Sequence, residues 1–368
     1  MEDYNSITNN NLVSIIIPMY NAEEFTSVMI ESIIAQTYTN WELIIIDDGS
    51  TDNCINIARD FERKDKRIKL ICRPNNIKKG ASSCRNIGIQ NSQGEFIIFL
   101  DADDYIAPYC LSQRVAFMQK HPDYDFAVFP MFAFKNELFD TPNLIWGYKQ
   151  ENNVFPNFIA GTIPFVVVTN IYRKNSILTK ELFWDTNLKS LQDSIYNITS
   201  LLKDCKFGFS NLLPDYFYRI GVNNNSISKK LTSDKHFISR LYFYRKVTSI
   251  NEQNYNPYFL ILTNIHFKFL CSDKNTSHIN KFLSSPFLKK YPVLKLKLYL
   301  IYYLMFYLKL TSFRFRDTIL LLTTPIFEIR QRLHYKKTLS QKIHLYKELI
   351  NKYSAEITVL KQIYSSNQ

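Results

Sequence analysis

Three apolar runs decide the fold: LVSIIIP at residues 12–18, WELIIID at 41–47 and EFIIFLD at 95–101. Within each run the apolar residues are nearly unbroken, and the runs end at a proline or at aspartates. Such runs are typical of strands that are buried on both faces of a parallel sheet. IKLIC at 68–72 predicts a further strand of the same kind.

Helical patterns lie between these strands. Residues 23–36 place apolar side chains at helical spacing, and we expect two more helices over 53–64 and 81–91. Alternating strands and helices predict an α/β fold with a mostly parallel sheet and helices on both of its faces. In such sheets ligands bind beyond the carboxyl ends of the strands, so the residues that follow each strand are the candidate site.

Composition excludes a disordered or fibrous protein, because 46% of the 368 residues are hydrophobic. The six cysteines form no C-x-x-C pair, and the first ten residues contain no apolar signal core. We therefore expect a reduced, cytoplasmic chain with no disulfide framework and no zinc site built from cysteines.

The net charge of +12 is unevenly distributed. Residues 229–368 contain 24 Lys and Arg against 7 Asp and Glu, whereas residues 1–228 have a net charge of −5. All eight glycines lie in the first 221 residues. This break predicts a catalytic domain over 1–228 and a helical, basic C-terminal region over 229–368.

Acidic side chains follow two of the predicted strands. Asp47 and Asp48 end one strand, and Asp101, Asp103 and Asp104 follow another. Carboxylates that meet at one sheet edge repel each other unless a cation or a hydrogen-bonding ligand lies among them, and Mg²⁺ and Mn²⁺ prefer oxygen ligands. The alternative for any one of them is a capping role in the following turn.

No phosphate-binding Walker loop and no Gly-x-Gly-x-x-Gly turn is present, which disfavours a P-loop NTPase and a dinucleotide dehydrogenase.

Five segments in order resemble the family-2 glycosyltransferases, whose catalytic domain has the GT-A fold. They are VSIIIPMYN (13–21), AQTY (35–38), ELIIIDDGSTD (42–52), KKGASSCRNIGI (78–89) and GEFIIFLDADD (94–104). The resemblance covers about the first 105 residues. It implies a nucleotide-sugar donor, a divalent metal (Mn or Mg) and inversion at the anomeric carbon.

The same resemblance assigns the donor site. Pro18, Tyr20 and Asn21 match the nucleotide-base pocket, and Asp48 matches an aspartate that accepts from the base. Arg85 matches a basic residue near the nucleotide. The alternatives are that Tyr20 only packs at the strand end and that Arg85 is a solvated or salt-bridged surface residue.

Asp101, Ala102 and Asp103 match the Asp-x-Asp motif, in which Asp103 is the expected direct metal ligand and Asp101 lies nearer the ribose and the metal. Arg219, in a Tyr-Arg pair, resembles a residue that closes the domain near the donor diphosphate.

Asp193 is the candidate catalytic base, because inverting transfer needs a carboxylate that takes the proton of the acceptor hydroxyl. It lies in LQDSIYNITSLL (191–202), which resembles the family's Glu-Asp segment with Gln192 in place of glutamate. The alternative is a first-turn acid that the helix dipole favours.

The region from 105 to 190 is less informative. Residues 126–134 and 164–174 predict strands. Trp146, Tyr148 and Trp184 are either platforms for a sugar ring or members of the core.

The basic C-terminal region favours a peripheral place on the inner face of the cell membrane. Residues 298–308 are an uncharged run flanked by lysines, shorter than the ~20 residues that a bilayer span needs. Such segments suit a helix in the membrane interface that is attracted to anionic lipid. The alternatives are packing on the catalytic domain and pairing in a homo-oligomer, and residues 344–364 suit a docking helix or a short coiled coil.

The sequence as a whole predicts transfer of a sugar, from a donor that is UDP-linked, to a saccharide or lipid-linked saccharide acceptor in surface polysaccharide or glycan synthesis. Two alternatives stay open: a sugar nucleotidyltransferase, and a basic module that binds nucleic acid. The acidic first domain argues against nucleic acid as a partner, and the absence of a glycine-rich N-terminal loop argues against a nucleotidyltransferase.

Overall fold

A computed structural model describes residues 11–141, 145–147, 154–159, 164–221 and 354–366, with isolated positions between 238 and 352. Strands and helices alternate through its first hundred residues, as the sequence predicts. The elements there are β1 (Val13–Met19), α1 (Glu23–Ile34), β2 (Trp41–Asp47), α2 (Cys54–Lys64), β3 (Ile68–Cys72), α3 (Ala81–Asn91) and β4 (Phe96–Phe99).

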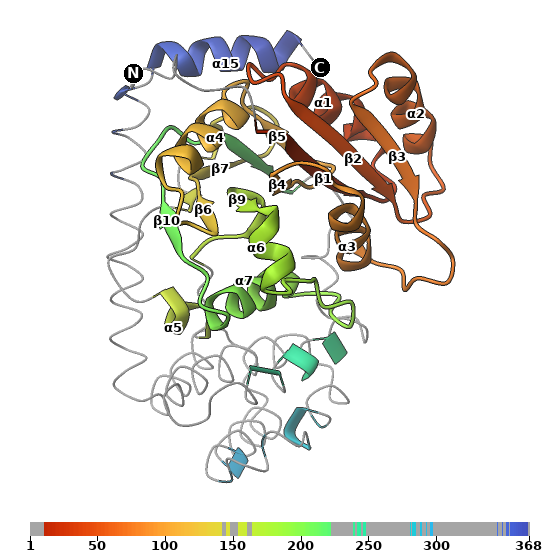
Figure 1. The fold of residues 1–368 in the computed structure, drawn as a ribbon, viewed down its shortest axis with the longest axis vertical. Helices are drawn as coiled ribbons and strands as arrows, with labels where there is room; N and C mark the ends of the chain where they lie inside the picture. The colour runs from red at the N-terminus through yellow and green to blue at the C-terminus, as the bar shows by residue number, and fades with distance from the viewer. Residues whose placement is uncertain are drawn as a thin grey trace, which may run out of the picture.

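A seven-stranded sheet in the order β10-β6-β9-β4-β1-β2-β3 forms the centre of the molecule (Figure 1). Its other strands are β6 (Phe126–Val128), β9 (Asn170–Arg173) and β10 (Phe207–Phe209). The four strands β3, β2, β1 and β4 pair in parallel, and β9 runs antiparallel to both of its neighbours. The sheet is therefore mostly parallel, and the carboxyl ends of β1, β2 and β4 meet at one edge.

Both faces of this sheet are buried, which explains the unbroken apolar runs. Ile16 and Ile46 pack with α3 on one face, whereas Ile15 and Ile45 pack with α1, α2 and α4 (Cys110–Lys120) on the other. Gly88 makes the close approach of α3 possible, since a Cβ there would lie 2.3 Å from Cγ2 of Ile16. The α/β fold with helices on both faces is confirmed.

A second, four-stranded sheet has the order β5-β11-β7-β8. Its members are β5 (Tyr105–Ile106), β7 (Met131–Phe134), β8 (Ile145–Trp146) and β11 (Tyr216–Arg219). The prediction of one strand over 126–134 was wrong: β6 ends before Pro130, and β7 joins the second sheet. Proline has no N–H to donate to a ladder, so the chain changes sheets there.

Of the predicted strand over 164–174, only β9 at its end is a strand, preceded by the short helix η2 (Val167–Thr169). The remaining helices are α5 (Val154–Ile159), α6 (Lys174–Thr179), α7 (Gln192–Leu202) and α15 (Ser354–Ser366). No helix among the described residues has the length and apolarity to cross a bilayer. The uncharged run over 298–308 lies outside the described residues.

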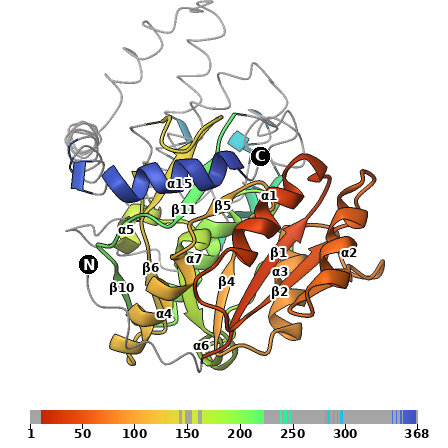
Figure 2. The same cartoon turned by 90° about the horizontal axis from the view of Figure 1, so that it is seen from above.

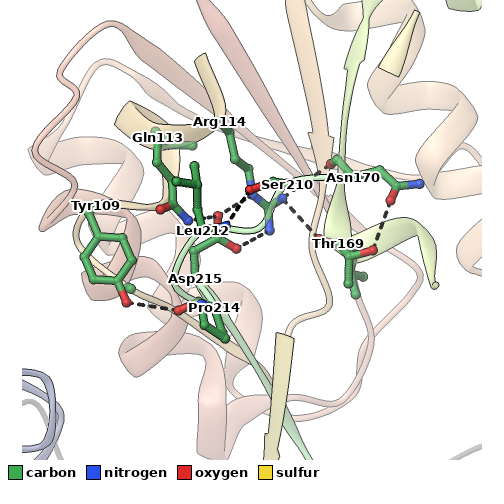
Figure 3. Close-up of polar contacts among 12 residues, drawn as sticks. Tyr109, Gln113, Arg114, Thr169, Asn170, Ser210, Leu212, Pro214 and Asp215 are labelled. Atoms are coloured by element: carbon green, nitrogen blue, oxygen red, sulfur yellow. Dashed lines mark hydrogen bonds and ion pairs between the residues drawn. The ribbon is translucent and has the colours of Figure 1, made fainter. Parts of the chain in front are cut away.

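A buried ion pair ties α4 to the start of β11 (Figure 3). Arg114 donates from Nε and Nη2 to the two carboxylate oxygens of Asp215 at 2.9 and 2.7 Å, and both side chains are fully buried. Gln113 donates to Asp215 as well, and Nη1 of Arg114 donates to the Val168 carbonyl. These bonds satisfy the charges that burial would otherwise penalise, and they fix the strand that begins with Tyr216.

Helix α15 lies against the second sheet (Figure 2). It buries Ile357, Leu360 and Tyr364 among Phe132, Phe134 and other aromatic side chains of that sheet. The spacing of the three buried residues is that of one helix face. For residues 354–366, the described end of this segment, the structure therefore shows a docking helix.

Candidate functional site

The Asp-x-Asp loop follows β4 at the sheet edge. Asp101 and Asp103 are partly exposed, whereas Ala102 and Asp104 are buried. Asp104 points inward: its carboxylate accepts hydrogen bonds from the Tyr216 hydroxyl and, at 2.7 Å, from the backbone N–H of Arg219. Asp104 thus anchors the loop to β11, while Asp101 and Asp103 stay partly exposed.

Burial and mutual repulsion perturb these carboxylates. Burial, the larger cause, and the neighbouring charge of Asp101 together raise the pKa of Asp103 to about 6. Burial also raises the pKa of Asp104 well above its usual range, with Asp103 and Asp101 adding to the effect. A divalent cation beside Asp103 and Asp101 would relieve this repulsion, so the donor set fits Mg²⁺ or Mn²⁺.

The described part of the chain has no group of three or more His, Cys, Asp or Glu side chains that could hold a metal.

Arg85 is buried beneath the loop and is not a solvated surface residue. Its Nη2 donates to Oδ1 of Asp101 at 2.7 Å, and its Nη1 donates to Oε1 of Gln192 at 3.3 Å. The guanidinium also lies over the ring of Trp184, 4.3 Å from the centroid. Arg85 therefore joins the Asp-x-Asp loop to the start of α7.

Trp184 belongs to the core. Its ring stacks on Tyr196 at 4.5 Å between centroids, with Arg85 over it as well. It has no free face for a sugar ring. Of the other two aromatic candidates, Tyr148 and the side chain of Trp146 lie outside the described residues.

Asp193 is the second residue of α7, and the residue that precedes the helix, Leu191, adopts a left-handed backbone with φ of 60°. The pKa of Asp193 is raised to about 6, mainly by burial; the charge of Arg85 acts to lower it and that of Asp101 to raise it. Residues 85, 101 and 193, far apart in sequence, are thus brought into one electrostatic group. A carboxyl with a pKa near 6 suits a general base at neutral pH.

A second group of candidate site residues lies at the end of β2, where Asp48 follows the strand. Its Oδ1 accepts from Nε of Arg73 at 2.5 Å and from the backbone N–H of Gly80 at 3.1 Å. Asp47 instead caps the turn, accepting from the N–H groups of Gly49 and Ser50. The capping alternative therefore holds for Asp47, whereas Asp48 is ion-paired.

Arg73 was missed by the sequence analysis. Its position in the sequence could have indicated this role. Arg73 directly follows β3, and since Cys72 is in register with Asp47, Arg73 lies beside Asp48.

The Pro18-Tyr20-Asn21 corner follows β1 beside Asp48. Tyr20 is 49% exposed, with Nζ of Lys79 3.8 Å from the centre of its ring. Asn21 has a positive φ of 48° and accepts from the N–H of Thr51 at 2.8 Å, which holds the corner on the turn after β2. An exposed ring in a fixed corner is available for a flat ligand.

Arg219, at the end of β11, lies on the other side of the Asp-x-Asp loop. Its Nε donates to the Asp103 carbonyl at 3.0 Å, and its Nη2 donates to the Tyr364 hydroxyl at 3.0 Å.

Residues 14–186 match the sequence profile of Glycosyl transferase family 2. These residues form a family-2 glycosyltransferase domain. Its Asp-x-Asp loop, Arg85 and the Asp48 corner all lie within the matched segment.

Similar proteins agree with this assignment. An uncharacterized glycosyltransferase of Haemophilus influenzae is 48% identical over 114 residues, which are 31% of this chain and 45% of that protein. The Escherichia coli protein WfgD, named UDP-Glc:alpha-D-GlcNAc-diphosphoundecaprenol beta-1,3-glucosyltransferase, is 42% identical over 33% of this chain and 44% of its own length. The chain thus spans about half the length of these relatives.

A solved structure is similar in fold. Staphylococcus aureus TarS 1–349 in complex with UDP-GlcNAc has a TM-score of 0.56 and 20% identity, over 94% of this chain and 92% of that one. At this identity the likeness concerns the fold alone.

Proposed function

We propose that this chain is an inverting glycosyltransferase that moves a sugar from a nucleotide sugar, UDP-linked, to a saccharide or lipid-linked saccharide acceptor in surface polysaccharide or glycan synthesis. One observation carries the proposal. Arg85 joins Asp101 to the turn that holds Asp193, inside a family-2 domain, at the sheet edge where Tyr20 and Asp48 also lie.

The donor base lies against Tyr20 in the corner that Pro18 and Asn21 shape, and Asp48 accepts a hydrogen bond from it. Support comes from the exposed ring of Tyr20 and from the fixed orientation of the Asp48 carboxylate. The diphosphate then reaches the Asp-x-Asp loop, where Arg219 closes the site. Arg85 keeps the Asp101 carboxylate oriented toward it.

Asp103 and Asp101 are the residues that would hold the divalent metal, Mn or Mg. When bound, the metal stabilises negative charge on the departing nucleoside diphosphate. The raised pKa of Asp103, caused first by burial and then by the neighbouring charge of Asp101, supports a cation at this place.

Asp193 accepts the proton of the acceptor hydroxyl as that oxygen attacks the anomeric carbon opposite the diphosphate. The bond from the acceptor oxygen to the sugar forms, the bond to the diphosphate breaks, and the anomeric centre is inverted. Its raised pKa, near 6, supports this role because the carboxylate is both ionised and basic at pH 7.

The proposed architecture is a catalytic domain over 1–228 and a basic C-terminal region over 229–368 that brings it to the anionic inner face of the membrane. The C-terminal region contains 24 basic and 7 acidic residues, which supports this role. The lipid-linked acceptor in the name of WfgD supports it as well. Pairing of subunits through the C-terminal helices is a further possibility of the same region.

The test is a screen of UDP-, GDP- and TDP-sugars for release of the nucleoside diphosphate, with and without a lipid-linked saccharide acceptor and with and without a chelator. We expect UDP release that needs acceptor and is lost in chelator. Release of pyrophosphate instead would favour a nucleotidyltransferase, and undiminished transfer in chelator would reject the metal.

A further inference from the structure

We infer that Tyr364, on the C-terminal helix α15, is a positioning residue that holds the Asp-x-Asp loop in its metal-binding shape through Arg219. This inference rests on the proposed function and extends it to a residue 261 positions beyond Asp103. None of the family motifs quoted above includes this tyrosine.

The first step is how Tyr364 is held. Its ring is 2% exposed and packs edge-to-face on Tyr105 at 5.1 Å and on Phe134 at 5.7 Å between centroids. Tyr105 directly follows the Asp-x-Asp loop, and Phe134 ends β7. The helix is seated by Ile357 and Leu360 on the same sheet. The tyrosine hydroxyl is therefore fixed in place.

The second step is the contact with Arg219. Its Nη2 donates to the Tyr364 hydroxyl at 3.0 Å, and its Nε donates to the carbonyl of Asp103 at 3.0 Å. The guanidinium also lies over the ring of Phe134, 4.5 Å from the centroid. A planar guanidinium that makes two hydrogen bonds and packs one face on an aromatic ring has little conformational freedom.

The third step is the consequence for the loop. The backbone N–H of Arg219 also donates to the Asp104 carboxylate. Arg219 therefore holds two consecutive residues of the loop, Asp103 and Asp104. Because Arg219 fixes the backbone of Asp103, it also fixes the position from which the Asp103 carboxylate extends. Partners that hydrogen-bond a metal ligand directly are worth about 10- to 100-fold in metal affinity. Arg219 bonds the backbone of Asp103, and Tyr364 acts through Arg219, so we expect a smaller effect from Tyr364.

The test compares Tyr364→Phe with the wild-type chain in calorimetric titration of Mn²⁺ in the presence of UDP. The variant keeps the ring and removes only the hydroxyl. We expect the Kd for Mn²⁺ to rise about three- to tenfold, with Kd for UDP without metal unchanged. The readout is binding, so it is independent of turnover. Thr358→Val is the matched control, since it removes an exposed hydroxyl from the same helix.

A double-mutant cycle separates positioning from mere stability. In an Arg219→Lys background, Tyr364→Phe should add no further loss of Mn²⁺ affinity, because lysine cannot make both bonds. Equal Kd values for wild type and Tyr364→Phe, or fully additive losses in the double variant, would overturn the inference. Failure of the wild-type chain to bind UDP with Mn²⁺ would instead overturn the proposed function.

Discussion

Asp193 is the residue on which the chemistry turns, and its surroundings make its ionisation measurable. Because its pKa is raised to about 6, the carboxylate is protonated in acid and cannot accept the acceptor proton. We expect kcat/KM to rise about tenfold per pH unit below about pH 6 and to level off above it. The check is a pH profile at saturating metal, since Asp103 titrates in the same range. A flat profile from pH 5 to 8 would contradict the assignment.

Ionised Asp193 also destabilises the folded protein. A carboxyl with a raised folded-state pKa binds more protons when folded than when unfolded, so stability falls as pH rises from about 4 to about 6 and stays lower above. Asp193→Asn should therefore stabilise the donor-free protein at pH 7 by about 1–2 kcal/mol. Urea unfolding at pH 7 and at pH 4 measures this, with a gain expected only at pH 7. An equal effect at both pH values would show that ionisation is not the cause.

Single residues also show the limits of sequence reasoning. Asp47 and Asp48 are adjacent and alike in sequence, yet one caps a turn and the other pairs with Arg73. The difference depends on which carboxylate faces the end of β3. That is set by the register between β2 and β3, which the sequence does not reveal. The partners of Arg85 likewise come from residues 101 and 192, which no local pattern connects.

At the scale of elements, the buried pair between Arg114 and Asp215 holds β11 in place behind the Asp-x-Asp loop. Asp215→Ala would leave the guanidinium buried without its charged partner, which costs about 3–5 kcal/mol. We expect that loss in urea unfolding. Asp60→Ala is the matched control, because its ion pair with Arg63 is exposed and worth about 0–1 kcal/mol. Equal losses in the two variants would contradict the role of the buried pair.

The elements of the first hundred residues were predictable because each buried strand is an uninterrupted apolar run. The second sheet was not. Its strands β5 and β8 have two residues each, too few for a pattern, and β7 is separated from β6 only by Phe129 and Pro130. The docking of α15 on this sheet brings residues 354–366 onto β7, more than two hundred residues away in the sequence, which spacing alone cannot reveal.

For the whole molecule, the opposite charges of the two regions suggest how it meets its acceptor. With a net charge of +17 over residues 229–368, we expect binding to vesicles that contain anionic lipid, at ~1 kcal/mol per basic residue near the surface. Cosedimentation should fall as salt rises and should be absent with purely zwitterionic vesicles. No binding to anionic vesicles at low salt would reject the membrane role.

The central claim is that one acidic site binds the donor and that Asp193 performs the transfer. The most direct test uses Asp193→Asn with the donor that the wild-type chain accepts. Calorimetry should give a donor Kd within about twofold of wild type, while transfer falls by about 100-fold or more, the usual contribution of a general base. Full turnover by Asp193→Asn, with donor binding intact, would contradict the account.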